Sequence, residues 1–386
     1  MKNSISSDSS KIKKVYIGSN ELSPFHECYS SEHLILRLAA GRYFAHYAGE
    51  NTEATYWALR ETAVLYDVPE RPIEISGKDV VQFLEKIFSR TIEDMSEGRG
   101  RYTLACTHVG GIFMDGIIFR LATDKFWFVQ PDGDLKTWLL AHQENYKVKI
   151  TDPSSRALQI QGPKSFQILK DLTNGALDQQ FGYFHSGFFT LDNQEVYISR
   201  TGWSGELGYE IYTNGNTTDC PQLWKYICDV GSKHGMVFSS MQSLNIRRIE
   251  AGILDSGSDF DHSLTPYEVG LIKFVDFENK NFKGRNALLA SPQDNRLFGI
   301  TCKETTPASG DEVFFENTQI GKVTTGAWSP YFKAGIGYVL LHNANEWTQR
   351  ALLKKEGLNK CVPIEIVSLP FLDPNKIIPR TIPILF

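Results

Sequence analysis

One local pattern, which occurs twice, constrains the fold of this 386-residue chain more than any other feature of its sequence. Segment 75–87 (Ile-Ser-Gly-Lys-Asp-Val-Val-Gln-Phe-Leu-Glu-Lys-Ile) aligns with segment 160–172 (Ile-Gln-Gly-Pro-Lys-Ser-Phe-Gln-Ile-Leu-Lys-Asp-Leu). Each copy has the signature of a strand end, a glycine turn and a helix with one apolar side. The recurrence modestly favours an internally duplicated α+β architecture, because strand, glycine and helix also follow one another in unrelated proteins.

Three strand-like segments lie between the two copies, at residues 101–106, 112–121 and 126–130, and turn residues separate them. This arrangement predicts an antiparallel meander, followed by a helix over residues 134–146. Upstream, apolar residues at helical spacing after an Asn-Thr cap predict a helix over residues 52–66. Because strands and helices come in runs and not in strict alternation, the sequence favours an α+β fold over a doubly wound sheet.

The composition is that of a globular chain with more than one core. Hydrophobic residues make up 41% of the sequence and charged residues 22%, and single cores stop growing at about 250–300 residues. Residues 296–386 carry short alternating strands that Gly and Pro interrupt. This pattern predicts a small β-rich C-terminal domain.

Charge and apolar pattern exclude several classes of partner. A formal net charge of −5 gives no basic field for phosphate backbones, so nucleic acid is not an expected partner. No apolar run reaches membrane-spanning length, and residues 1–14 lack the apolar segment of a signal peptide, so we expect no membrane partner. The six dispersed cysteines favour neither a zinc site nor a disulfide framework. We therefore expect a cytoplasmic protein without a bound metal.

General nucleotide-binding and hydrolase motifs are missing, but three segments are unusual. In segment 101–119, Asp115 interrupts an apolar strand, where an acid is most often an edge or turn residue. Segment 200–212 has three glycines that allow a ligand to approach the backbone, and Glu210 follows them, although a tight turn between strands is an equal alternative. Segment 247–271 has paired arginines and several acids, which could form a solvated ion-pair network.

Seven motifs follow one another along the chain: Trp57-Ala-Leu-Arg-Glu-Thr-Ala-Val-Leu-Tyr-Asp-Val, Ile160-Gln-Gly-Pro, Arg200-Thr-Gly-Trp-Ser-Gly-Glu, Arg248-Ile-Glu-Ala, Pro266-Tyr-Glu-Val-Gly-Leu, Phe282-Lys-Gly-Arg-Asn-Ala-Leu-Leu and Thr325-Gly-Ala-Trp-Ser-Pro. In this order they resemble the glycine-cleavage T-protein family, which includes aminomethyltransferases and demethylases. The resemblance extends from about Ser23 to Leu340, so it is far more specific than any single motif.

The resemblance implies a three-domain clover-leaf arrangement around a central folate channel. One domain is split in such an arrangement. The expected division is residues 1–72 for the first part of domain 1, 73–150 for domain 2 with the meander and helices, 151–285 for the second part of domain 1, and 286–386 for the β-rich C-terminal domain.

The resemblance also implies a site that binds tetrahydrofolate. Its catalytic aspartate matches Asp115, its ring-contacting tyrosine matches Tyr102 and its pterin-binding glutamate matches Glu210. The remaining cofactor-binding residues that it implies are Trp203, Gln130 and Arg248. A carboxylate such as that of Glu210 can bind the donor edge of a pterin through two hydrogen bonds. Asp115 is expected to orient the cofactor and to stabilise positive charge near the reactive nitrogen.

Two departures from the family pattern affect the expected reaction. Met114 stands where many members have a second acid, and Leu244 stands where aminomethyltransferases usually have an arginine. Segments 201–204 and 249–259 are more similar to the dimethylsulfoniopropionate demethylases, and segments 63–67 and 115–119 are similar to the aryl-methyl-ether demethylases. We therefore expect a demethylase that moves a methyl group from a small methylated donor to tetrahydrofolate.

The expected donor is a sulfonium or a quaternary or methylated amine. Such a cation could bind to the faces of Trp203, Tyr102 and Trp328, although a core position is the more common fate of a residue such as Trp328. One alternative is a true aminomethyltransferase, which needs a lipoyl carrier protein and releases ammonia. Another is a folate-binding iron–sulfur assembly factor, but these carry a Lys-Gly-Cys-Tyr signature and residues 279–285 contain no cysteine.

Overall fold

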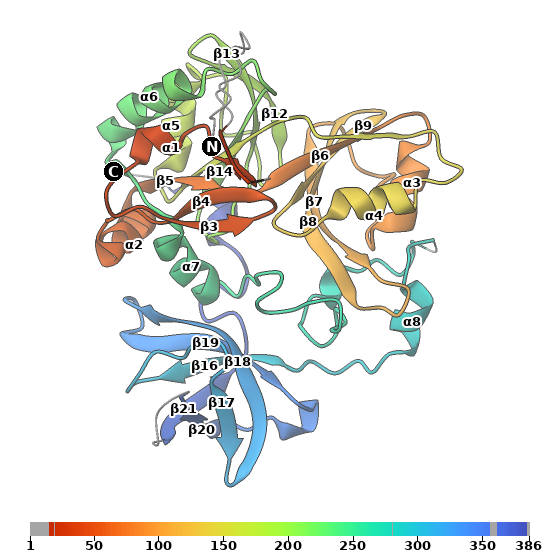
Figure 1. Ribbon diagram of the computed structural model, residues 1–386, viewed down its shortest axis with the longest axis vertical. Helices are drawn as coiled ribbons and strands as arrows, with labels where there is room; N and C mark the ends of the chain where they lie inside the picture. The colour runs from red at the N-terminus through yellow and green to blue at the C-terminus, as the bar shows by residue number, and fades with distance from the viewer. Residues whose placement is uncertain (1–14, 19, 280, 356–360, 384–386) are drawn as a thin grey trace.

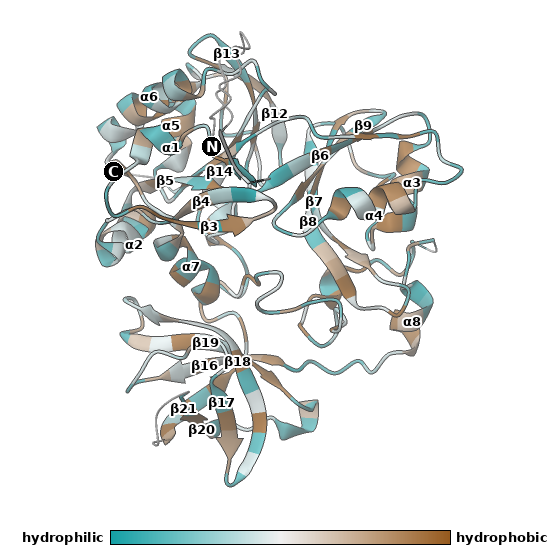
Figure 2. Cartoon of the chain, in the orientation of Figure 1, coloured by the Kyte–Doolittle hydropathy of each residue, from teal (hydrophilic) through white to brown (hydrophobic). Residues whose placement is uncertain are grey.

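The computed structural model describes residues 15–18, 20–279, 281–355 and 361–383, and in it both copies of the repeated segment fold as a strand, a turn and a helix (Figure 1). The first copy is β6 (Arg71–Ser76) followed by α3 (Val80–Ile87), and the second is β11 (Ala157–Gln161) followed by α5 (Ser165–Leu172). Five of the eight residues of α3 are hydrophobic, and the helix is largely brown in Figure 2. The two units lie in different sheets, so each begins a core of its own.

A glycine is required at the turn of each unit. Gly77 and Gly162 have φ angles of 132° and 124°, which are disfavoured for residues with a side chain. A Cβ atom on Gly77 would lie 2.3 Å from the carbonyl oxygen of Lys147, and one on Gly162 would lie 2.7 Å from that of Thr62. The two glycines therefore permit the close approach of neighbouring backbone.

The predicted meander is part of a five-stranded antiparallel sheet. Its strand order is β10-β6-β9-β8-β7, with bounds Lys149–Thr151, Arg71–Ser76, Lys125–Gln130, Ile112–Ala122 and Arg99–Cys106. Helix α3 packs on this sheet together with α4 (Leu135–Ala141), which ends earlier than the predicted helix 134–146. The buried residues between them form one hydrophobic core, which includes Ile73, Phe83, Leu84, Phe128 and Leu139.

A six-stranded sheet forms the second core. Its order is β12-β13-β14-β11-β5-β15, with bounds Ser186–Leu191, Gln194–Ser199, Gly208–Thr213, Ala157–Gln161, Ala63–Val68 and Met236–Phe238. All pairs are antiparallel except β15 with β5. Helices α5 and α6 (Cys220–Gly231) pack against it (Figure 1).

The predicted helix over residues 52–66 is wrong in its last five residues. Helix α2 covers Thr52–Glu61, and β5 covers Ala63–Val68, whose six residues are all buried. Strand β5 pairs with β11 on one side and with β15 on the other. A strand that is buried on both faces has a continuous apolar run, which helical spacing cannot distinguish from a helix.

The C-terminal part of the chain is a closed six-stranded barrel (Figure 1). Its strands, in spatial order, are β16 (Leu297–Cys302), β19 (Ala334–Leu341), β18 (Thr318–Ser329), β17 (Glu312–Phe315), β20 (Arg350–Lys354) and β21 (Cys361–Val367). The α+β class and the β-rich C-terminal domain are therefore confirmed. The smaller elements are a four-stranded sheet in the order β1 (Val15–Ile17), β2 (Asn20–Leu22), β4 (Arg42–Tyr47) and β3 (Ile35–Ala39), and helices α1 (His26–Tyr29), α7 (Met241–Glu250) and α8 (Arg285–Ala290).

Helix α7 lies at the junction of the barrel with the rest of the chain (Figure 1). The carboxylate of Glu250, near its C-terminal end, accepts hydrogen bonds from Tyr56 of α2 at 2.7 Å and from Ser329 of β18 at 2.6 Å. One buried side chain thus connects both parts of the molecule. None of the helices in the described part of the chain is long and apolar enough to cross a membrane.

Candidate functional site

Asp115 lies in the interior of β8, opposite Leu104 of β7, and only 8% of the residue is exposed. The composition-based interpretation of this acid as an edge or turn residue is therefore wrong. Strand β8 has partners on both sides, β7 and β9, which the sequence of a single strand cannot reveal. A carboxylate at such a position is costly unless other groups compensate its charge.

The two oxygens of Asp115 have different surroundings. Oδ2 accepts a hydrogen bond from the Tyr102 hydroxyl at 2.8 Å, whereas Oδ1 is buried and has no partner among the described residues. Burial raises the pKa of the Asp115 carboxyl to about 6, and the negative charge of Asp255 adds to this increase, while the Tyr102 hydrogen bond opposes it. Asp115 is thus mostly ionised at neutral pH, with one oxygen free for a ligand.

Glu210 is the third residue of β14 and is 5% exposed. Its Oε1 accepts from Gln159 at 2.9 Å, and its Oε2 accepts from the hydroxyls of Tyr212 at 2.9 Å, Ser199 at 3.4 Å and Thr201. Burial raises the pKa of Glu210 in spite of these donors. The two oxygens of a carboxylate together offer about four acceptor sites. Oε2 already accepts from three hydroxyl groups, so it has no site left for a ligand. Oε1 therefore keeps the remaining acceptor site.

Two acids that were not predicted connect Asp115 with Glu210. The charge of Asp255, in the loop after α7, raises the pKa of Asp115 and also that of Glu70. The charge of Glu210 raises the pKa of Glu70 more strongly. Since such repulsion weakens with distance, the four carboxyl groups share one region of the molecule. Asp255 lies in the acid-rich segment 247–271, but no sequence signal distinguishes Glu70 from other acids after a strand.

Unsatisfied acceptor atoms occur in this region. Oδ1 of Asp115, Oε1 of Gln159 and Oε2 of Glu70 are buried and have no hydrogen-bond partner in the described part of the chain. The great majority of buried polar atoms in proteins have a hydrogen-bond partner, so each exception needs an explanation. A ligand that presents several polar groups would satisfy them.

Trp203 and Arg248 lie together beside the loop that carries Asp255. The Arg248 guanidinium stacks on the Trp203 ring, with its carbon 5.2 Å from the ring centre, and forms an ion pair with Asp259. The Trp203 indole donates to the carbonyl oxygen of Leu254 at 3.4 Å. Both side chains therefore hold the loop that carries Asp255.

The other predicted residues differ in their surroundings. Both ends of the Gln130 side chain hold the turn before α4, through Gly133 at 2.8 Å and Leu135 at 3.1 Å. Trp328 is 46% exposed, so the core position expected for it is wrong. Among the described residues, no group of three or more His, Cys, Asp or Glu could hold a metal ion, and the six cysteines are free.

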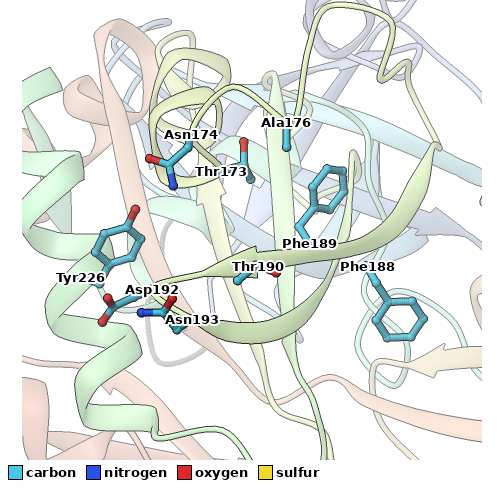
Figure 3. A pocket seen from close by; sticks show the side chains of 9 residues that line it. All are labelled: Thr173, Asn174, Ala176, Phe188, Phe189, Thr190, Asp192, Asn193 and Tyr226. Atoms are coloured by element: carbon cyan, nitrogen blue, oxygen red, sulfur yellow. The ribbon is translucent and has the colours of Figure 1, made fainter.

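An open hollow of about 540 Å³ lies elsewhere, between α5, β12 and α6 (Figure 3). It is lined by Thr173, Asn174, Ala176, Phe188, Phe189, Thr190, Asp192, Asn193 and Tyr226. None of the predicted site residues belongs to it. The strongly perturbed carboxyl groups point instead to the region between β8 and β14 as the functional site.

Two family models together cover most of the chain. The model of the GCVT N-terminal domain matches residues 32–279, and that of the glycine cleavage T-protein C-terminal barrel domain matches residues 295–373. The first match contains all six predicted site residues, and the second falls on the barrel.

Individual relatives agree with these models. An aminomethyltransferase from Caldanaerobacter subterraneus subsp. tengcongensis is 31% identical over 302 residues, which cover 76% of this chain and 80% of the relative. An aminomethyltransferase from Halothermothrix orenii is 30% identical over 328 residues, which cover 82% and 90%. The crystal structure of glycine cleavage system aminomethyltransferase T from Bartonella henselae covers 91% of this chain and 98% of its own, with a TM-score of 0.81 at 22% identity, so the folds are alike.

Proposed function

Since this chain belongs to the glycine cleavage T-protein family and is a tetrahydrofolate-dependent one-carbon transferase, we propose that it accepts its carbon as an aminomethyl group from a carrier-bound donor. Support comes from relatives of 30–31% identity, which are named aminomethyltransferases and align over about three quarters of the chain. None of these three relatives is named a demethylase, so the demethylase function that the sequence motifs favour becomes the second candidate.

The residues of the site fit tetrahydrofolate. The pterin edge presents an amino group and a ring N–H side by side, and these donors match the acceptors left open on Glu210 and Gln159. We assign these two side chains to the pterin. The aromatic rings of Tyr102 and Phe274, whose centres are 4.6 Å apart, form an apolar wall beside Asp115.

Asp115 is the residue that we place next to the reacting carbon. When bound, tetrahydrofolate supplies a nucleophilic ring nitrogen that accepts this carbon. The free Oδ1 of Asp115 can orient an N–H group, and its negative charge can stabilise a cationic donor. Tyr102 holds the carboxylate through Oδ2, which fixes the direction of Oδ1. The observation that carries this assignment is the buried Oδ1 of Asp115, which has no partner among the described residues while Tyr102 holds Oδ2.

A methyl group from a sulfonium or quaternary ammonium donor is the second candidate. Two departures from the aminomethyltransferase pattern favour it. Leu244 is fully buried with Tyr66 and Trp203 in a hydrophobic cluster, so no cation is present there to contact a carrier protein. Met114, in the place of a second acid, is 2% exposed. Both donors are cationic near the carbon that is transferred, so the acids of the site suit either one.

Product analysis distinguishes the two candidates. The purified chain is incubated with tetrahydrofolate and either an aminomethylated lipoyl carrier or a panel of sulfonium, betaine, methylamine and methoxyaryl donors. We expect 5,10-methylenetetrahydrofolate and ammonia from the carrier. Formation of 5-methyltetrahydrofolate from a small methylated donor, without turnover of the carrier, would establish the second candidate. No folate product from any donor would contradict both.

A further inference from the structure

Glu70 has a fixed backbone and an incompletely bonded side chain. Glu70 follows β5, and its backbone carbonyl oxygen accepts a hydrogen bond from Arg42 Nη1 at 2.9 Å. Nη2 of the same guanidinium donates to the backbone carbonyl oxygen of Ser155 at 2.9 Å. Arg42 therefore bonds to the main chain of Glu70 and not to its carboxyl. The neighbouring Arg71 forms its ion pairs with two other acids, Glu21 and Asp152.

Gln159 joins the carboxyl of Glu70 to that of Glu210. It lies on β11, between β5 and β14, directly opposite Glu210 in the strand register, and it is fully buried. Its Nε2 lies 2.9 Å from Glu210 Oε1 and 3.4 Å from Glu70 Oε1. Oε2 of Glu70 and Oε1 of Gln159 have no partner in the described residues. Three polar side chains thus form a continuous row with two oxygen atoms that have no partner in the described residues.

Three acids act on the Glu70 carboxyl, and the hydrogen bond from its own backbone N–H opposes them. They come from β14 (Glu210), β5 (Asp67) and the loop after α7 (Asp255), and each raises its pKa. Burial is the largest cause, and together these effects raise the pKa of Glu70 to about 8. At neutral pH the Glu70 carboxyl therefore keeps its proton and can donate a hydrogen bond. Glu210, in contrast, accepts hydrogen bonds from four side chains.

The edge of a pterin has a fixed order of groups. A carbonyl oxygen and a ring nitrogen, which are acceptors, flank the two adjacent donors. A carboxylate that binds the two donors leaves each flanking acceptor without a partner unless a neighbouring group donates. A carboxylic acid can donate, whereas a carboxylate cannot.

We propose that Glu70 is a further cofactor-binding residue, whose protonated carboxyl donates to the pterin acceptor next to the donors bound by Glu210. The inference rests on the proposed position of the pterin beside Glu210. Glu70 can bind the pterin acceptor in this way only while its carboxyl is protonated. Folate affinity should accordingly be constant near neutral pH and decrease as pH rises through about 8.

Calorimetric titration of tetrahydrofolate from pH 6 to 9.5 tests this role. For the wild-type chain we expect affinity to fall above pH 8, approaching tenfold per pH unit, and at pH 9 binding should take up a proton from the buffer. Glu70→Gln should keep the affinity of the wild type at pH 7 without the alkaline fall, because an amide donates at every pH. Glu70→Ala should bind about tenfold more weakly at pH 7. Glu61→Gln, an exposed acid of α2, is the matched control and should behave as wild type.

Glu210→Gln separates failure of this inference from failure of the proposed site. If Glu210→Gln weakens binding while Glu70→Ala does not, or if wild-type affinity does not change between pH 7 and 9, Glu70 is not a pterin ligand. If neither variant affects binding, the pterin lies elsewhere. Should Glu70→Ala fail to fold, the pH profiles of wild type and Glu70→Gln still decide the question.

Discussion

Asp115 combines a buried position with a single fixing partner, and this defines its role. Its Oδ2 accepts a hydrogen bond from Tyr102, whereas its Oδ1 has no partner among the described residues, so the side chain is fixed in place and one oxygen can still bind a ligand.

We predict that Asp115→Asn lowers turnover by about a hundredfold or more, because the charge that stabilises the cationic donor is lost. Tetrahydrofolate affinity, measured by calorimetry, should be mostly kept. Asp124→Asn, in the exposed turn before β9, is the control. Equal turnover in Asp115→Asn and wild type would remove Asp115 from the mechanism.

The pH dependence of the rate depends on the same carboxyl. Burial raises the pKa of Asp115 from its ordinary value of 3.8 to about 6, so the charged form is complete only above that pH. The rate with saturating substrates should increase with pH through about 6 and then remain level. Asp115→Asn should have a low rate without this increase. A wild-type rate that is constant between pH 5 and 8 would contradict the assignment.

Asp255 should influence this profile without contacting the carboxyl. Its negative charge is one of the causes that raise the pKa of Asp115. In Asp255→Asn the rising part of the profile should therefore move to lower pH. The shift should be small, because burial is the larger cause and is unchanged. A shift to higher pH would mean that the two charges do not interact in this way.

The sequence predicted some of the candidate site residues and missed others. The family resemblance predicts roles for Glu210 and Asp115, whereas composition alone made Asp115 an edge residue. Glu70 and Asp255 were missed, because an acid after a strand or a helix is common and only the folded chain brings these acids together. The roles proposed for Gln130 and Arg248 as cofactor ligands stay predictions, although both side chains are engaged with protein groups.

At the level of elements, the repeated strand-turn-helix unit was predictable because its glycine has a steric cause. Gly77→Ala should destabilise the chain by more than the ~1–3 kcal/mol of a strained φ angle, since the new Cβ would lie 2.3 Å from a backbone oxygen. Gly175→Ala is the matched control, with a φ of 83° and no atom within 4 Å. Chemical denaturation measures both. An equal loss in the two variants would show that the close approach is not a determinant.

Element boundaries were less predictable than element types. Residues 52–66 have apolar spacing that suits a helix, but Ala63–Val68 is a strand in the middle of the six-stranded sheet. The pairing partners of this strand, β11 and β15, are about ninety and one hundred and seventy residues further along the chain. A local pattern cannot contain that information, so tertiary pairing overrides it.

For the whole molecule, the ion pair between Arg248 and Asp259 connects the site to the barrel. Arg248 Nη2 donates to Thr325 of β18 at 2.9 Å, and Asp259 Oδ1 accepts from Thr324 at 2.7 Å. Both charged residues are almost completely buried. The barrel therefore helps to fix the loop that carries Asp255, and a change in this pair should affect both stability and activity.

Arg248→Met should lower the free energy of unfolding by about 3–5 kcal/mol, because it leaves the Asp259 charge buried without its partner. The double variant Arg248→Met/Asp259→Leu should recover part of this loss, since no unpaired charge remains. Chemical denaturation of the two variants measures the difference. A double variant that is less stable than the single one would show that the pair stabilises the junction by itself. The domain boundaries after residues 72, 150 and 285 stay a prediction at this scale.

The central claim is that Asp115 and Glu210 face one cavity that holds a reduced folate. The most direct measurement is a crystal structure of the chain with 5-methyltetrahydrofolate. We predict that the pterin edge contacts Glu210 and Gln159, and that the methyl-bearing nitrogen lies next to Asp115. A folate bound away from these side chains, or a pterin that contacts one of the two acids while the other faces a different cavity, would contradict the claim.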